Sequence, residues 1–68
     1  MWTQKTIEAA FRVYDVYVAN FRKYKAEGDR YYDNSDWCLA KHAYDKAMVW
    51  YNHAELVYKA LKEQLTKN

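Results

Sequence analysis

The sequence predicts an all-α protein made of two long antiparallel helices, joined as a helical hairpin with coiled-coil-like packing. Two observations support this fold class. Apolar and small residues recur at alternating intervals of three and four along both halves of the chain. Residues that end or cap helices gather in one segment, GDRYYDNSDW at residues 28–37, which holds the only glycine of a chain without proline.

The first helix is expected from about residue 3 to residue 33, with Thr3 placed to cap its N-terminus. One stripe of this segment keeps the helical spacing without a slip, and it predicts the side of the helix that packs on the second one. We call this stripe the seam. Its residues in the first helix are Ile7, Ala10, Tyr14, Tyr17, Phe21, Tyr24, Gly28 and Tyr31.

The turn is expected at residues 33–36. Asn34 or Ser35 can cap the second helix there, and Asp36 places a negative charge at the positive end of the helix dipole. The second helix is expected over about residues 36–66. Its predicted seam residues are Trp37, Ala40, Tyr44, Ala47, Tyr51, Ala54, Tyr58, Leu61 and Leu65.

With a tight turn, the residue numbers of two facing positions sum to about 68. Phe21 is then expected to face Ala47, and Gly28 to face Ala40. Large residues meet small ones in this register, as knobs-into-holes packing requires. A glycine inside a helix costs about 1 kcal/mol relative to alanine, and a close approach of Gly28 to Ala40 would explain its presence.

Six residues around the turn follow the spacing of a known repeat. They are Gly28, Tyr31, Trp37, Ala40, Tyr44 and Ala47. Through them, residues 21–52 resemble one unit of the tetratricopeptide repeat family, whose inter-helix turn falls where residues 33–36 lie. The chain differs from the family at Asn52, where proline usually ends the second helix, and it has no second copy of the pattern. The resemblance therefore implies the packing of one unit without an inherited binding groove.

An alternative architecture follows from this resemblance. If the long helices break near Asn20 and Asn52, the chain forms a three- or four-helix bundle of a single repeat. Neither place contains glycine or proline. The unbroken hairpin is therefore the favoured prediction.

Size and composition narrow the class of protein. A chain of 68 residues has room for one small domain, expected to span residues 1–68, whose core seldom supplies more than about 3–5 kcal/mol. Cys38 is the only cysteine, so no internal disulfide can form, and a reducing compartment is expected. The chain has no charged-then-apolar leader and no apolar run near the ~18 residues of a membrane span. We expect a cytoplasmic protein that does not enter membranes.

Apolar residues on both sides of the predicted seam indicate a second packing surface, since a helix that serves one seam is polar there. On one side lie Val13, Val16, Ala43, Trp50, Val57 and Ala60, together with Ala9; on the other side lie Phe11, Val18 and Met48. The simplest occupant is another copy of the chain, because two-fold dimers are the commonest oligomers and two hairpins make a four-helix bundle.

Aromatic residues make up 19% of the chain, and large rigid rings are enriched in protein interfaces. We therefore expect a protein–protein interaction module that forms a homodimer or docks on a partner protein. Such a small protein would suit an adaptor, or a small regulator or inhibitor of the kind that mobile genetic elements encode.

Catalytic and metal sites are not expected. The only serine lies in the turn, and no serine, histidine and acid are placed to meet. Cys38, His42 and Asp45 share one helix face, but three ligands from a single helix make a poor metal site. We expect no enzyme activity, no catalytic residue, no metal and no cofactor.

Nucleic-acid binding is the alternative function. A basic cluster near the turn could neutralise a phosphate backbone, and an exposed ring beside it could stack on a base. The residues are Arg22, Lys23, Lys25, Arg30 and Tyr32. Glu27 and Asp29 interrupt this cluster, and the net charge is only +2, which favours the protein-interaction hypothesis.

Overall fold

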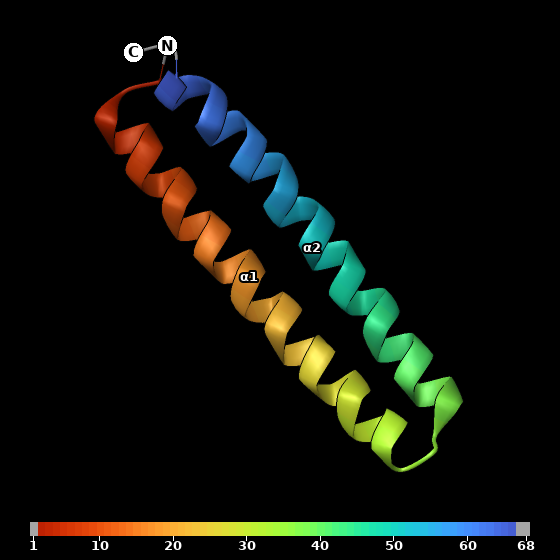
Figure 1. The fold of residues 1–68 in the computed structure, drawn as a ribbon. Helices are drawn as coiled ribbons and strands as arrows, with labels where there is room; N and C mark the ends of the chain where they lie inside the picture. Colours follow the sequence, from red (N-terminus) through yellow and green to blue (C-terminus); the bar gives the residue numbers. More distant parts are fainter. Residues whose placement is uncertain (1, 67–68) are drawn as a thin grey trace.

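The computed structural model describes residues 2–66, which form two α-helices. Helix α1 runs over Gln4–Asp33 and helix α2 over Trp37–Thr66. They lie antiparallel in a rod, with the turn at one end and both the start of α1 and the end of α2 at the other (Figure 1). The Cα atoms extend over 49 × 15 × 12 Å.

The predicted all-α helical hairpin is confirmed. Each helix runs without a break through the places, near Asn20 and Asn52, where the alternative would divide it. The three- or four-helix bundle is therefore wrong. Met1 and residues 67–68, which the expected domain includes, lie outside the described residues.

The N-terminus of α1 is capped as predicted. Thr3 has an extended backbone, and its side-chain oxygen accepts a hydrogen bond from the Thr6 N–H at 3.2 Å. This bond satisfies one of the N–H groups that the first turn of a helix leaves without a partner. The Trp2 backbone N–H also donates to Gln64 Oε1 at 3.1 Å, which joins the start of α1 to the end of α2.

The turn between the helices is a Schellman motif. The Ser35 N–H donates to the Tyr32 carbonyl oxygen at 3.0 Å, and the Asp36 N–H donates to the Tyr31 carbonyl oxygen at 2.8 Å. This motif requires a left-handed residue just beyond the helix, and Ser35 supplies it with a φ of 61°. A residue with a Cβ costs about 1–2 kcal/mol in this conformation, and the two hydrogen bonds offset that cost.

The cap of α2 is Asp36, so the prediction of Asn34 or Ser35 is wrong. The Asp36 carboxylate accepts from the Leu39 N–H at 3.4 Å, and its carbonyl oxygen accepts from the Ala40 N–H at 2.9 Å. Asn34 and Ser35 cannot cap α2 because both are needed to end α1. The negative charge of Asp36 does lie at the N-terminus of α2, as predicted.

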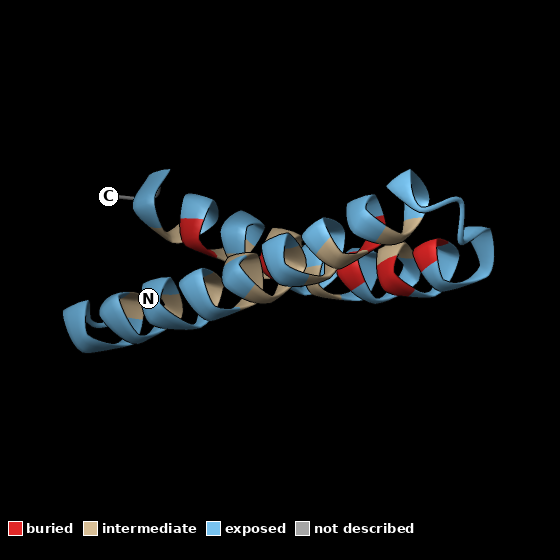
Figure 2. Cartoon of the chain, turned by 90° about the horizontal axis from the view of Figure 1, so that it is seen from below, coloured by how far each residue is buried: buried red, intermediate tan, exposed pale blue. Residues whose placement is uncertain are grey.

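Small residues form the centre of the helix contact. The buried residues lie in the contact between the two helices (Figure 2). They are Gly28 in α1 and Ala40, Ala43, Ala47, Ala54 and Leu61 in α2. Because glycine and alanine occupy so little space, the backbones of the two helices can approach closely along this line.

The predicted seam of α1 is confirmed, since each of its residues from Ile7 to Tyr31 is buried or half-buried. The predicted seam of α2 is partly wrong. Every seventh residue from Ala40 to Leu61 is buried as expected, but four of the other predicted seam residues are exposed: Trp37, Tyr51, Tyr58 and Leu65. Trp50 and Val57, which directly precede Tyr51 and Tyr58, are half-buried instead, and Ala43 is buried beside the half-buried Tyr44.

The physical reason is the close approach of the helices, which leaves no room for a ring at the centre of the contact. The rings lie along its edges and meet across the helices there. Tyr14 and Tyr58 have ring centroids 6.2 Å apart, and Phe21 and Tyr51 have centroids 5.6 Å apart. Each of these partners on α2 lies one helical turn beyond the alanine that was expected to face the ring.

Gly28 makes room for the ring of Tyr44. A Cβ added at Gly28 would lie 2.6 Å from Tyr44 Cδ1 and Cε1, far inside van der Waals contact. The expectation that the glycine serves a close approach to Ala40 is therefore corrected, because the nearest atoms are those of Tyr44. The ring covers the bare Cα of α1 and explains why glycine stands in the middle of a helix.

We predict that Gly28→Ala destabilises the hairpin by about 1–3 kcal/mol, although alanine favours the helix by about 1 kcal/mol. In a Tyr44→Ala background the clash is absent, so the same change should stabilise the protein. Urea unfolding of the four chains, followed by circular dichroism, gives both free energies. A Gly28→Ala effect of the same sign in both backgrounds would contradict this role of Tyr44.

Candidate interaction surface

An apolar groove runs between the two helices near the start of α1. It has a volume of about 430 Å³, and Thr6 supplies its only polar side chain. The residues that line it are Trp2, Thr6, Ala9, Ala10 and Val13 from the first half of the chain and Leu56, Val57 and Ala60 from α2. The antiparallel hairpin brings these two segments side by side.

An aromatic cluster follows the groove toward the turn. The ring centroid of Tyr17 lies 5.7 Å from that of Trp50 and 5.5 Å from that of His53, while Trp50 and His53 meet edge to face at 5.8 Å. Val16, which is 57% exposed, lies between this cluster and the groove in the sequence of α1. We call the groove, the cluster and Val16 together the groove face. No charged residue belongs to it.

The structure brings together most of the residues predicted for a partner surface. Val13, Val57 and Ala60 line the groove, and Trp50 belongs to the aromatic cluster. Ala43 does not join them, because it is only 5% exposed and packs within the hairpin. The reason is the rotation of the α2 seam, which turns Ala43 toward α1.

Sequence reasoning missed three residues of the groove, Trp2, Thr6 and Leu56, and placed a fourth, Ala10, in the seam. A signal for Trp2 was present, since Trp2, Thr6, Ala9 and Val13 follow one another at intervals of four, three and four. No comparable signal exists for Leu56, which becomes part of the groove only when the two helices pack.

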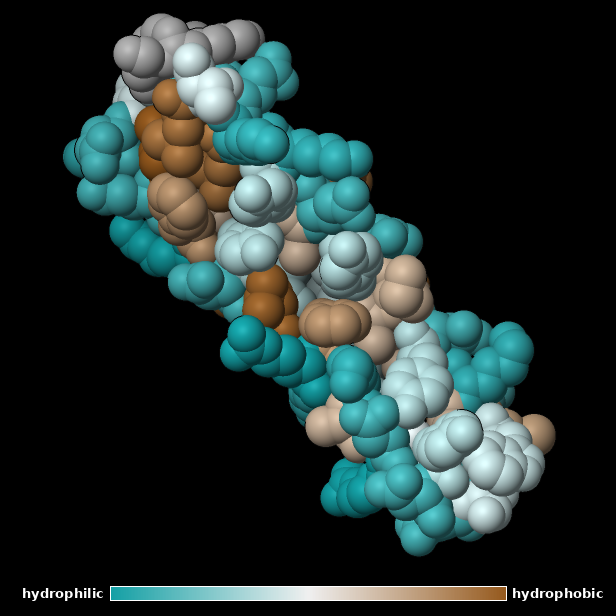
Figure 3. Space-filling view, in the orientation of Figure 1, coloured by the Kyte–Doolittle hydropathy of each residue, from teal (hydrophilic) through white to brown (hydrophobic). Residues whose placement is uncertain are grey.

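The opposite face holds two smaller hollows on either side of the Tyr14–Tyr58 ring pair. One, of about 180 Å³, includes Glu55; the other, of about 250 Å³, includes Phe11, Leu65 and Lys62. Charged side chains thus border both hollows, unlike the groove. On the face of the molecule that Figure 3 shows, apolar side chains gather between the helices near the start of α1, and hydrophilic ones follow the outer edges.

The residues of the nucleic-acid alternative do not form one continuous basic surface. Lys25 pairs with Asp29 at 3.3 Å, and the ring of Tyr32 packs edge-on against Trp37 with centroids 4.9 Å apart. Arg22 and Lys23 are consecutive, so they point about 100° apart around α1. Arg30 is exposed. Nucleic-acid binding stays a prediction.

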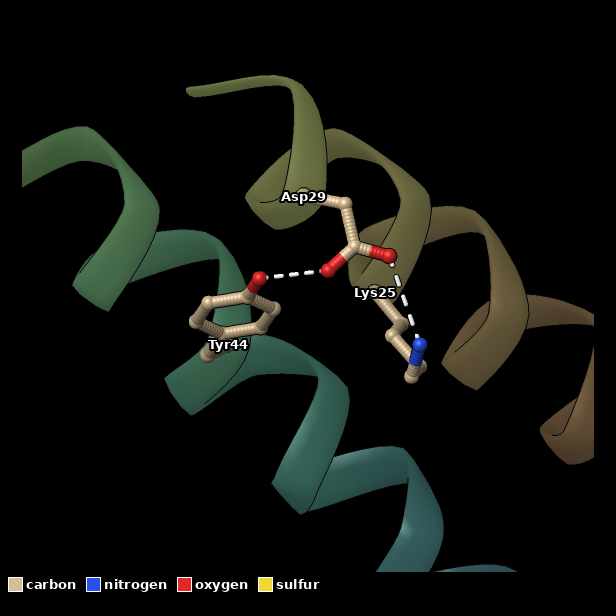
Figure 4. A network of polar contacts seen from close by, with 3 residues as sticks. All are labelled: Lys25, Asp29 and Tyr44. Atoms are coloured by element: carbon tan, nitrogen blue, oxygen red, sulfur yellow. Dashed lines mark hydrogen bonds and ion pairs between the residues drawn. The ribbon is translucent and has the colours of Figure 1, made fainter. Parts of the chain in front are cut away.

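A polar network near the turn joins the two helices. The Tyr44 hydroxyl donates to Asp29, which also pairs with Lys25 (Figure 4). The hydrogen bond from Tyr44, followed by that from Lys25, lowers the pKa of Asp29 below its usual 3.8. In return, the bond to Asp29 and the partial burial of the ring raise the pKa of Tyr44 to about 12.

Comparisons of the chain with protein-family models, with curated proteins and with solved structures found no match. The resemblance to a tetratricopeptide unit therefore rests on its six residues alone. Neither helix of the described chain has an apolar stretch long enough to cross a bilayer. Within residues 2–66, no three His, Cys, Asp or Glu side chains are grouped to hold a metal ion.

We predict that the Tyr44–Asp29 bond makes stability depend on pH at both extremes. The pKa of Asp29 is lowered in the folded protein. Its contribution to the free energy of unfolding is therefore present above pH 3.8 and is lost as the pH falls through the pKa of the folded state. Tyr44 has a raised pKa, so its contribution is present below pH 10.0 and is lost as the pH rises toward about 12.

NMR titration of the Asp29 carboxyl carbon tests the cause of this shift. Tyr44→Phe should raise the pKa of Asp29 more than Lys25→Met does, because the tyrosine makes the larger contribution. The reverse order, or no change with Tyr44→Phe, would show that the hydrogen bond between the helices does not stabilise the carboxylate.

Proposed function

We propose that this protein is a small non-catalytic interaction module that binds another copy of itself through the groove face. The observation that supports this proposal is the absence of charge from that face, in a chain where 29% of the residues are charged. The cores of protein–protein interfaces are typically depleted in charged residues and enriched in aromatic ones. An adaptor or a small regulator would use such a surface, and the lone thiol of Cys38 suits a reducing compartment such as the cytoplasm.

The small core of the hairpin supports the same proposal. Among the described residues, no large side chain is fully buried, and four of the five buried hydrophobic side chains are alanines. A domain of this size usually requires a disulfide, a metal or a partner chain for its stability. A second hairpin against the groove face would give Val13, Val57 and Trp50 the second layer that a hydrophobic core needs.

The area of one broad side of the rod, which includes the groove face, also fits a second copy. A stable interface buries about 800 Å² on each partner. The broad side of the rod measures 49 × 15 Å between Cα atoms, so one whole side has about the area that a two-fold dimer requires. The opposite side is less suitable, because Glu55 and Lys62 border its hollows and would lose their hydration in a dimer.

We predict that the protein is a dimer and that Val13→Glu separates it into monomers, since the variant would bury an unpaired carboxylate in the groove. Phe11→Glu is the matched control. The two residues lie in the same helix with similar exposure, 41% for Val13 and 45% for Phe11, but Phe11 lies on the opposite face. Trp50 is less suitable for this test because its ring also packs on Tyr17 within the hairpin.

Size-exclusion chromatography with light scattering gives the mass of each chain, and circular dichroism checks that each variant remains helical. The expected result is a dimer for the native chain and Phe11→Glu, and a monomer for Val13→Glu. A native chain that stays monomeric at high concentration would overturn the proposal, as would two variants that behave alike.

A further inference from the structure

We infer that the two copies associate with their turns at the same end, so that Glu27 of each copy pairs with Lys46 of the other. This inference rests on the proposed self-association through the groove face. It assigns the orientation of the second copy and a pair of charged residues that selects it.

The groove face changes from apolar to charged as it approaches the turn. In α1, Val13, Asn20 and Glu27 are spaced by seven and share one helix side, and Val13 lines the groove. In α2, Lys46, His53 and Ala60 share one side by the same spacing. Ala60 lines the groove, and His53 belongs to the aromatic cluster. Toward the turn, α1 thus continues the groove face with the acid Glu27 and α2 with the base Lys46. By the same spacing, Val16 is followed by Lys23, a second base, whose Nζ atom lies 5.5 Å from the ring centroid of Tyr24.

The two charges lie about one helical turn apart along the rod, within the reach of a lysine side chain. The Lys46 Nζ atom is 5.6 Å from the ring centroid of Tyr24, which lies one helical turn before Glu27 in α1. Glu27 is half-buried. Ion pairs of the two helices include Lys25–Asp29, Lys41–Asp45 and Lys59–Glu55. Neither Glu27 nor Lys46 takes part in them, so both charges are available to a partner.

Two different two-fold axes can relate the copies, and they give different orientations of the second copy. A two-fold axis along the rod places α1 of each copy antiparallel to α2 of the other, with residues of equal height opposite one another. Apolar residues then meet apolar residues, and Glu27 lies about one helical turn from Lys46 of the partner copy, in each of two symmetry-related places. All neighbouring helices are antiparallel, as in an up-down four-helix bundle.

The other two-fold axis lies across the rod and sets the turns at opposite ends. If the apolar parts overlap, Glu27 and Lys46 of each copy project beyond the partner. If the whole rods overlap, both charges pack against the groove of the partner, which offers no counter-charge and would impose a desolvation cost. Charge complementarity therefore favours the axis along the rod.

Charge reversal tests this orientation. Glu27→Lys leaves only positive charges at the site, and Lys46→Glu places two carboxylates there. Each homodimer should be weakened about tenfold, whereas an equimolar mixture should form a heterodimer in which both pairs are restored. Native mass spectrometry of the mixture measures the heterodimer fraction. Lys41→Glu, which alters a lysine paired with Asp45 within its own helix, is the control and should show no partner preference.

The native Cys38 gives a second readout without changing the interface. It is the only cysteine, it is exposed, and it lies in the first turn of α2. Spin labels on the two copies should lie about 30 Å apart if the turns share an end, given helix diameters of about 10–12 Å. With the turns at opposite ends, they would be separated by the 49 Å length of the rod or more.

The outcomes separate the two proposals. A preferred heterodimer and a short Cys38 distance support the inference. A stable native dimer with no heterodimer preference and a long Cys38 distance overturns the orientation and leaves the proposed self-association intact. A native chain that remains monomeric at every concentration removes both proposals together.

Discussion

The close approach of α1 and α2 along a row of small residues is the constraint on which the rest of the structure depends. Ala40, Ala47 and Ala54 recur every seven residues on α2, and all three are buried. Because a methyl group fills so little space, the backbones come close, and the only ring that packs directly on the facing backbone is that of Tyr44, for which Gly28 makes room. The rings of residues such as Tyr58 and Trp50 therefore lie along the edges of the contact, where part of each remains in water.

This geometry connects the fold to the proposed function. A core of alanines buries little apolar area. A fully buried large side chain would contribute about 1.5–3 kcal/mol of stability, and the described residues include none. The apolar area that the seam cannot cover appears on the two faces of the rod. One face has charged residues at its hollows, whereas no charged residue lines the groove on the other. The same packing that limits the stability of one hairpin thus leaves an apolar groove for a second layer.

The helices and one side of the contact could be predicted from the sequence, and the other side could not. In α1, a single stripe keeps the helical spacing, so the seam followed directly. In α2, the alanine row alternates by three and four with Tyr44, Tyr51 and Tyr58, and equally with the residues just before them. Periodicity cannot choose between these two rows, because packing distance decides which is buried. The groove was only partly predictable for the same reason: Leu56 joins it through the fold, while Val13 and Val57 are visible as flanks of the stripe.

The central claim is that one hairpin lacks a sufficient core and that a second copy supplies it. Thermal unfolding at several protein concentrations measures this most directly, because a dimer that unfolds to monomers has a concentration-dependent midpoint. Circular dichroism over a roughly hundredfold range should show the Tm rising by several degrees for this small domain. A cooperative transition with the same Tm at every concentration would show that the single hairpin is stable alone, and the account would be contradicted.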